Sequence, residues 1–363
     1  MSLVVRKLLK RRATIFALCV IAGNCILSLM AYIVAPDHSP NANTMILELG
    51  AKAPGSAYTF IKIPKTITPI STSLWQKFWN GSDEPYTLLP VLHTWKDKEY
   101  VFVQHYIDDG LTDTLCYQVA TFPASGKKAF RIEDQLVKHT FYLGTDRYGR
   151  DILSRLLIGS RVTMQVGLCA VLLSLTIGIF LGSIAGYYGG WADNVVLWFI
   201  NIIYAIPTLL LVFAITLALG KGLYEVFIAI GCSIWTGAAR VIRGQVMVIK
   251  EMEYITAAKA IGLGNARIIA RHILPNISGT IMVLAAGNFA TAILAEAGLS
   301  FLGFGVQPPQ PSWGLMIKEN YNFVLAGKPF PALIPGFAIM LLVFAFNMLG
   351  NALRDEADVR SKQ

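Results

Sequence analysis

Long and nearly uncharged apolar runs limit the fold of this chain more than any other feature. A helix that crosses the hydrocarbon core of a bilayer needs about 20 predominantly apolar residues. The sequence offers six such runs, at residues 14–34, 162–187, 195–219, 223–239, 279–299 and 332–353. Only 15% of the residues are charged and 55% are hydrophobic, a balance that soluble domains seldom have. The sequence therefore predicts an all-α polytopic membrane protein with six transmembrane helices.

Basic residues beside these runs predict the orientation, because Lys and Arg collect on the cytoplasmic side. Five basic and no acidic residues lie at positions 6–12, and segment 240–276 holds six basic and two acidic residues. Six crossings place both segments and both termini on the cytoplasmic side, although Lys221, Lys318 and Lys328 then fall outside. The first run is longer than a signal-peptide core and lacks Ala-x-Ala-like processing residues after it, so we expect it to be retained.

Residues 37–157 differ in kind from the rest of the chain. They contain no spanning run, and short alternating stretches at 100–104 and 116–120 are typical of strands. An extracytoplasmic, mixed or β-rich insertion between the first two helices is the expected structure. The predicted organisation is an N-terminus with the first helix at 1–36, the insertion at 37–157, a five-helix domain at 158–353 and a cytoplasmic tail at 354–363.

Five residues inside the apolar runs have a predicted structural or functional role. Gly178, Gly182 and Gly186 recur at every fourth position, which clears a side-chain-free stripe for close packing of another helix. Pro207 is expected to kink the third helix. Glu296 is an acidic residue near the end of an apolar run, where it either contacts a pathway or gate or reaches the outer interface. The other runs hold almost no charge, which disfavours an ion-coupled carrier.

The segment between the fourth and fifth runs has the pattern of two short helices. Residues 253–262 read as a first helix, Gly262 and Gly264 as a break, and 266–272 as a basic amphipathic helix before Pro275. Ala257 and Ala258 are expected to form a small-residue face on which another protein can lie. As a pattern alone, this is an exposed cytoplasmic helix pair.

This segment resembles the EAA loop of binding-protein-dependent ABC importer permeases. The family pattern is Glu-Ala-Ala, three residues, Gly, nine residues and then Ile-x-Leu-Pro. The chain departs from it at Thr256, where the family has Glu, and at His272, where it has Ile; Glu253 could supply charge one turn earlier. The matching positions are Thr256, Ala257, Ala258, Gly262, Leu274 and Pro275.

Other motifs resemble the C-type subunits of dipeptide and oligopeptide permeases. They include stretches at 185–190, 297–303 and 347–355. The resemblance runs from about residue 142 to the C-terminus and includes the first helix, whereas the insertion between residues 40 and 139 has no counterpart that we can name. The motif before the second run consists of Gly144, Thr145, Asp146, Gly149, Arg150 and Asp151.

The resemblance implies a type I ABC importer permease fold in a bacterial cytoplasmic (inner) membrane. It implies a related permease as heterodimer partner, two ABC ATPase subunits and an extracytoplasmic solute-binding protein that delivers di- or oligopeptides. No GxxxxGK[ST] phosphate loop occurs in the sequence, so ATP hydrolysis is expected in the partners. We expect no cofactor, metal or nucleic acid. Nickel chelates or glutathione stay open as substrates, and a membrane-anchored binding or sensor protein is the alternative function.

Overall fold

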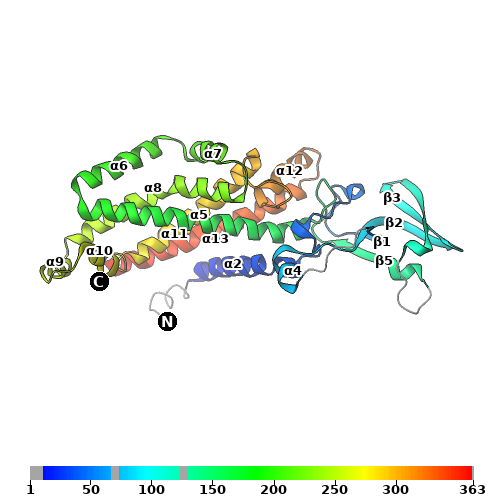
Figure 1. Cartoon of the computed structure of the whole chain (residues 1–363), viewed down its shortest axis with the longest axis horizontal. Coiled ribbons are helices and arrows are strands. Elements are labelled where there is room, and N and C mark those ends of the chain that lie inside the picture. The colour runs from blue at the N-terminus through cyan, green and yellow to red at the C-terminus, as the bar shows by residue number, and fades with distance from the viewer. Residues whose placement is uncertain (1–10, 67–72, 123–129, 362–363) are drawn as a thin grey trace. The chain divides into compact units, whose positions relative to one another are not determined.

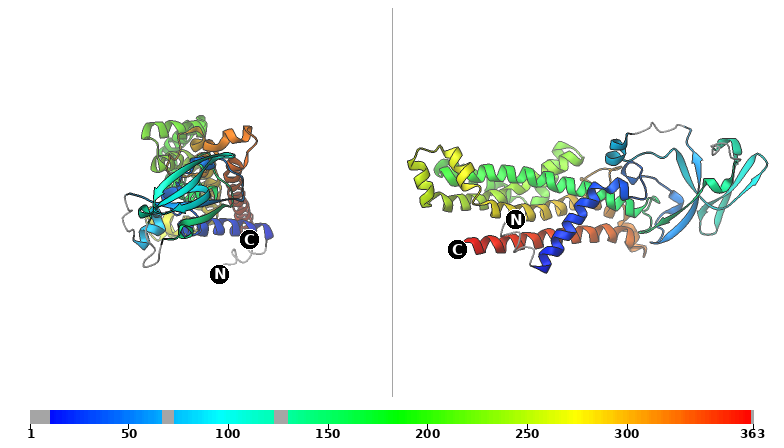
Figure 2. Two further views of the ribbon diagram at one scale, coloured as in Figure 1. Left: turned by 90° about the vertical axis from the view of Figure 1, so that its right-hand side faces the viewer. Right: turned by 90° about the horizontal axis from the view of Figure 1, so that it is seen from below.

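The computed structural model describes residues 11–66, 73–122 and 130–361. It divides into a helical unit, built from residues 1–26, 162–307 and 337–363, and a sheet unit, built from 27–161 and 308–336. Figures 1 and 2 show the helices and the sheet from three directions. The basic residues at positions 6, 7 and 10, which helped to predict the orientation, lie outside the described residues. The last two positions of the predicted tail also lie outside them.

Five helices in the described part of the chain are long and apolar enough to cross a membrane. A bent pair adds a sixth span if its two helices count as one. The prediction of six spans therefore depends on that pair, which consists of α6 (Gly190–Ala205) and α7 (Thr208–Leu219). The five long helices are α2 (Arg12–Leu29), α5 (Ile152–Tyr188), α8 (Leu223–Lys250), α11 (Ser278–Leu302) and α13 (Phe330–Ser361).

Pro207 separates α6 from α7, and the two helices meet at an angle of 94°. The expectation of one continuous, kinked helix at 195–219 is wrong, because the structure has two separate helices there. Proline has no amide hydrogen, and its ring pushes the preceding residue out of the helical region. Ile206 accordingly has φ −97° and ψ 128°, so the helix stops and restarts.

Three helices extend well beyond the apolar runs that predicted them. α13 continues to Ser361 instead of ending at residue 353, so most of the predicted tail is helical. α8 continues to Lys250 instead of ending at residue 239, so that Arg240 and Arg243 belong to a helix and not to a loop. α5 begins at Ile152 rather than near residue 162. The Ser154 amide donates to Asp151 Oδ2 at 2.8 Å, which is the N-cap arrangement of a helix start. Apolar runs locate the membrane part of a helix and miss its polar ends.

A five-stranded antiparallel sheet forms most of the sheet unit, in the order β4-β3-β2-β1-β5. The stretch at 100–104 falls inside β3, and the stretch at 116–120 covers the end of β4 and a following turn. Phe60 and Ile61 are fully buried on opposite faces of β1, so both faces of the sheet are covered. The strands are β1 (Ser56–Pro64), β2 (Tyr86–Asp97), β3 (Tyr100–Asp108), β4 (Leu111–Gln118) and β5 (Leu136–Phe141).

In the described part of the sheet unit, three α-helices lie wholly within the unit. They are α3 (Ala31–Val34), α4 (Leu74–Asn80) and α12 (Trp313–Leu325). The Leu315 amide donates to the Ser312 side chain at 3.2 Å, which caps α12 at its N-terminus. α4 ends where Gly81 adopts φ +77°, at the Asn80-Gly81 turn.

The three glycines at four-residue spacing lie where α5 contacts α8. A methyl group on Gly182 would lie 2.6 Å from the carbonyl oxygen of Ala239, and one on Gly186 would lie 2.6 Å from that of Arg243. On Gly178, it would lie 2.8 Å from the Ala238 methyl. The backbones of α5 and α8 therefore approach as closely as glycine permits.

Replacing Gly182 with alanine is expected to destabilise the helical unit by about 1–3 kcal/mol, because overpacking forces the two backbones apart. The measurement is thermal unfolding of the purified protein in detergent. Gly287 on α11 has no atom within 4 Å of such a methyl group, so Gly287→Ala is the matched control and should not lower the melting temperature. Equal losses in both variants would contradict the packing role.

Candidate functional site

The segment between α8 and α11 folds as two short helical pieces with a glycine turn between them. α9 (Glu253–Ala260) comes first, followed by α10 (Asn265–Ile268) and a π-helical turn at Ile269–Ile273. Gly262 has φ +82°; its amide donates to Lys259 O, and the Leu263 amide donates to Ala258 O. This pair of bonds is a Schellman motif, which requires a left-handed residue at the glycine position. Leu274 and Pro275 follow the π-helical turn.

α9 has an inner and an outer face. Ile255 and Ala258 are buried, whereas Glu253, Thr256 and Ala257 are exposed. The expectation that Ala257 and Ala258 form one shared surface is therefore wrong, because neighbouring helical residues point about 100° apart. Glu253 and Thr256, three residues apart, lie on the same outer face.

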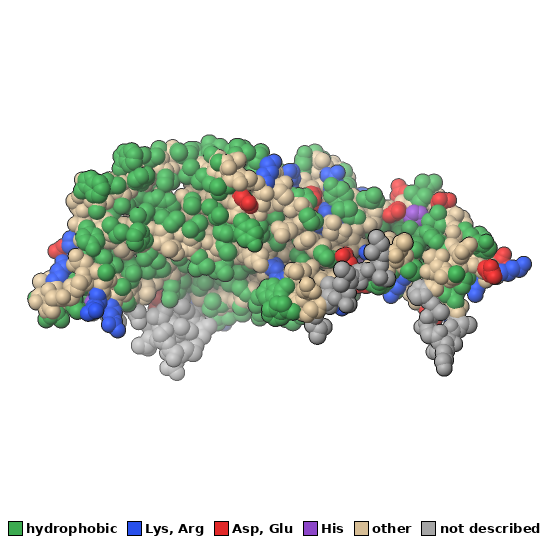
Figure 3. All heavy atoms as spheres, viewed as in Figure 1, with side chains coloured by type: hydrophobic (Ala, Val, Ile, Leu, Met, Phe, Trp, Pro, Cys, Tyr) green, Lys and Arg blue, Asp and Glu red, His purple; other side chains and the backbone are tan. Residues whose placement is uncertain are grey.

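The outer face of α9 combines apolar and charged groups. Ile261 is 79% exposed, and Tyr254 and Met252 are each 45% exposed, while Glu253 and Lys259 are also exposed. Charged side chains gather at this end of the helical unit, and the sides of its long helices are mostly apolar (Figure 3). Exposed apolar residues with a charged rim are typical of a protein interaction surface.

Two hydrogen bonds connect α9 and α10 to α5 and to the residues just before α11. Tyr187, near the end of α5, donates through its hydroxyl to Asn265 Oδ1 at 2.9 Å. Its ring centroid also lies 5.4 Å from Lys259 Nζ. Asn276, just before α11, donates from Nδ2 to the Tyr254 hydroxyl at 2.9 Å. Our sequence reasoning missed these contacts, although Tyr187 belongs to the motif at 185–190.

α8 is fixed to α6 close to the same segment. The Arg243 guanidinium donates to both carboxylate oxygens of Asp193, with 2.6 Å between Nη2 and Oδ2. Arg240 Nη2 donates to Asn201 at 3.2 Å, and the guanidinium lies 4.4 Å from the Tyr204 ring centroid. A bidentate arginine–carboxylate pair is among the strong and geometrically specific contacts in proteins, so α6 and α8 are held together at this point.

Glu296 lies in the interior of the helical unit. It is fully buried and accepts a hydrogen bond from the Ser300 hydroxyl at 2.7 Å. Since no part of it is exposed, the interpretation that it reaches the outer interface is wrong. Pro207 is exposed at the break between α6 and α7. Leu209 of α7 lies next to Gly298 of α11, because a methyl group added to Gly298 would lie 3.4 Å from Leu209 Cδ1. The two helices therefore meet near Glu296.

The motif before α5 lies in the sheet unit and forms a buried ion cluster with α12. Asp146 accepts from Arg150 Nε at 2.6 Å, and Arg150 Nη2 donates to Glu319 Oε2 at 2.6 Å. Arg155 also donates to Glu319, at 3.3 Å. Asp146, Arg150 and Arg155 are each 1% exposed. Arginine pairs of this kind hold two segments that lie far apart in the sequence.

The remaining residues of the motif shape the turn around this cluster. Thr145 donates to Leu49 O and accepts from the Lys52 amide, and the Thr145 amide donates to Lys52 O. The neighbouring Gly144 has φ +79°. Asp151 caps α5, and its burial raises the pKa of its carboxyl above the usual range.

Removing the charge of Glu319 is expected to destabilise the sheet unit by about 3 kcal/mol, because two buried guanidinium groups lose their shared carboxylate. The check is thermal unfolding of Glu319→Gln. Asp109→Asn is the matched control. Asp109 pairs with Lys52, but its side chain is 86% exposed, and exposed ion pairs contribute little to stability. A melting temperature of Glu319→Gln equal to that of Asp109→Asn would rule out a stabilising cluster.

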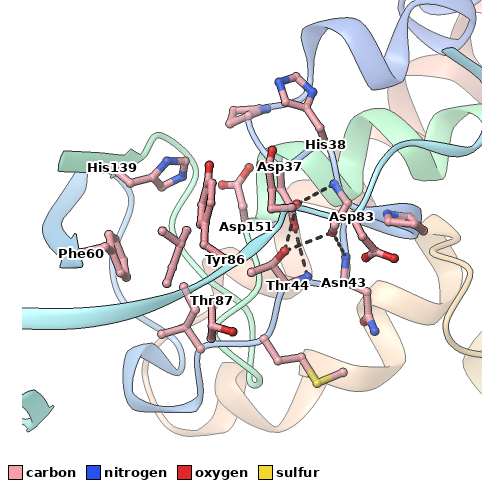
Figure 4. A pocket seen from close by; sticks show the side chains of 18 of the residues that line it. Asp37, His38, Asn43, Thr44, Phe60, Asp83, Tyr86, Thr87, His139 and Asp151 are labelled. Atoms are coloured by element: carbon pink, nitrogen blue, oxygen red, sulfur yellow. Dashed lines mark hydrogen bonds between the residues drawn. The ribbon is translucent and has the colours of Figure 1, made fainter. Parts of the chain in front are cut away.

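A cavity of about 690 Å³ opens on one side of the sheet, between β1, β2 and residues 36–46. Asp37 accepts hydrogen bonds there from the Ser39 amide and from the amide and hydroxyl of Thr44 (Figure 4). Phe60 and Tyr86 line it together with His139. Among the described residues, no group of three or more His, Cys, Asp or Glu side chains could hold a metal ion.

Comparisons with known proteins identify the family. Residues 178–357 match the family described as binding-protein-dependent transport system inner membrane component. A dipeptide transport system permease protein of Alkalihalophilus pseudofirmus is 44% identical over 232 residues, which cover 64% of this chain and 75% of the relative. A glutathione transport system permease of Pectobacterium atrosepticum is 40% identical over 61% of this chain and 73% of the relative.

An oligopeptide transport system permease of Bacillus subtilis is 37% identical over 222 residues, covering 61% of this chain and 72% of the relative. These relatives give no support to a membrane-anchored sensor as the function. They are transport permeases rather than enzymes, and several apolar helices agree with a multi-pass protein of a bacterial inner membrane. The chain belongs to the family of binding-protein-dependent transport system inner membrane components and is a permease subunit of an ABC importer.

Proposed function

We propose that this permease imports di- or oligopeptides and that α9 is the helix on which a cytoplasmic ATPase docks. A related permease would complete the translocation pathway, two ABC ATPases would drive it, and an extracytoplasmic solute-binding protein would deliver the peptide. The names of the dipeptide and oligopeptide relatives support this substrate class. In this scheme, both termini and α9 are cytoplasmic, and the sheet unit is extracytoplasmic.

The observation that carries the docking role is the two-sided structure of α9. Its inner face is anchored by Ile255 and Ala258, and its outer face presents Ala257 between exposed charged and apolar groups. An anchored helix can transmit a force, because its inner contacts do not yield when a partner pushes on its outer face. Glu253 supplies a charge one turn before Thr256, where the family pattern has its glutamate.

Contacts around α9 provide a route from the ATPase to the membrane helices. Movement of α9 and α10 would pull on α5 through Tyr187 and, through Asn276, on the residues just before α11. Because α5 packs closely against α8, and Arg243 joins α8 to α6, these helices would move together. Rigid movement of a helix group is the usual basis of alternating access.

We assign Pro207 and Glu296 to the pathway or its gate. The break at Pro207 gives α6 and α7 a point at which their angle can change without breaking a helical hydrogen bond. Glu296 is a buried acidic group in a membrane helix, and such groups commonly face a polar pathway or a protein interior. Both features occur where α7 contacts α11.

Purification of the tagged chain from its native membrane tests the proposed assembly. We expect two other kinds of subunit to come with it in fixed proportion, a second permease and an ATPase. The Ala326→Trp variant, changed at an exposed position after α12, should recover the same subunits. Recovery of the chain alone, with transport activity, would overturn the proposed function.

A further inference from the structure

The sheet unit contains an exposed aromatic cluster that transport does not explain. Trp75, Phe78 and Trp79 lie on α4 at a spacing of three and four residues, which places them on one helix face. Their rings contact one another, with centroids 6.2 Å apart for Trp75 and Phe78 and 5.3 Å apart for Phe78 and Trp79. Even so, Trp75 is 70% exposed and Trp79 is 37% exposed.

Arg161 fixes α4 beside the end of a membrane span. Its Nη1 donates to the carbonyl oxygen of Trp79 at 2.9 Å, and its Nη2 donates to that of Leu29 at 3.3 Å. Leu29 is the last residue of α2. One guanidinium group thus joins the C-terminal end of α4 to the end of α2, so the two helix ends lie at the same level.

Aromatic rings around the same guanidinium strengthen this connection. The Arg161 carbon Cζ lies 4.6 Å from the Trp79 ring centroid, 5.4 Å from that of Tyr32 and 5.9 Å from that of Phe78. Arg161 itself is 6% exposed. Cation–π contacts of a desolvated arginine are the stronger ones, and α4 is therefore held firmly in place rather than loosely attached.

The surface next to α4 is apolar and exposed, and it belongs to the end of a candidate membrane span. In the spanning window of α2, only 17% of the residues are buried inside the structure. That exposed apolar surface continues past the helix end. Leu29, Met30, Ile33 and Val34 are between 41% and 54% exposed.

We propose that α4 is an interfacial helix that places Trp75 and Trp79 in the headgroup layer of the leaflet in which α2 ends. Tryptophan concentrates at this depth because its ring is apolar and its indole N–H is polar. Lys77, exposed on the same short helix, can extend to lipid phosphates. The partner is the lipid surface, and the anchor holds the sheet unit to the membrane by a contact other than the spanning helices.

Depth-dependent fluorescence quenching tests the proposal on the full-length chain in vesicles. The vesicles contain phosphatidylcholine brominated near the glycerol end of its acyl chains, and iodide is the quencher in the water phase. Subtracting the emission of Trp75→Phe or Trp79→Phe from that of the unchanged chain isolates one tryptophan. Trp95→Phe is the control, because Trp95 on β2 is 46% exposed and stacks on Phe102.

The emission of Trp75 and Trp79 should be quenched by the brominated lipid at least twice as strongly as that of Trp95, and iodide should show the reverse order. The phenylalanine variants keep an aromatic ring and should insert normally. Quenching of Trp75 by iodide with no effect of the brominated lipid would overturn the proposal. Protection from both quenchers that appears only in the assembled importer would overturn it as well, because a protein partner would then cover α4.

Discussion

Replacing Gly149 with alanine is expected to prevent stable folding of the sheet unit. Gly149 has φ +71°, and a methyl group there would lie 1.7 Å from the carbonyl oxygen of Ile46. The left-handed conformation alone costs about 1–2 kcal/mol for a residue with a side chain. The clash is with backbone, which cannot rotate away, so the total loss should be on the order of 4 kcal/mol or more.

Folding can be measured as the yield of monodisperse protein after detergent extraction and as the melting temperature of what remains. Gly110→Ala is the control that separates the two causes. Gly110 has φ +87° but no atom within 4 Å of an added methyl group, so it suffers only the conformational cost. If the two variants lost the same stability, the close contact between Gly149 and residue 46 would not be important.

Replacing Ala257 with tryptophan is expected to abolish most ATP-driven uptake and to leave membrane insertion unchanged. The residue is exposed on the outer face of α9, so the helical unit has room for the larger ring. In a docked complex, the ring would meet the ATPase surface, where overpacking costs about 1–3 kcal/mol. Since 1.4 kcal/mol is a factor of ten, uptake into vesicles should fall about 5- to 150-fold.

Insertion of this variant is checked by its yield in the membrane fraction, and ATPase activity is measured in the same sample. Ala326→Trp is the control, because it adds the same ring to an exposed alanine of the sheet unit. Normal uptake by Ala257→Trp would show that no subunit covers the outer face of α9.

Local chemistry made several parts of this structure predictable. Apolar runs located the membrane helices, since the bilayer sets their length. Pro207 marked the place where the third apolar run changes direction, although the structure has a break there instead of the expected kink. Gly262 marked the end of α9, because each of these residues has backbone constraints of its own. In each case, a few neighbouring residues decide the conformation.

The rest depends on contacts between residues far apart in the sequence. Nothing near Arg150 indicates that its partner is Glu319, which comes from α12. Tyr187 gains its role only when Asn265 folds back beside it. The direction of Ala258 was predicted wrongly because the side of α9 that faces inward is set by the buried Ile255 and not by the Ala-Ala pair itself.

Site-specific photo-crosslinking from α9 in the assembled importer tests the central claim most directly. A photoreactive amino acid would replace Ala257 on the outer face or Ala258 on the inner face, one position at a time. We predict a light-dependent crosslink from position 257 to an ATPase subunit, and from position 258 none beyond contacts within the chain itself. Absence of an ATPase crosslink from position 257, with the complex shown to be intact, would contradict the docking of an ATPase on α9.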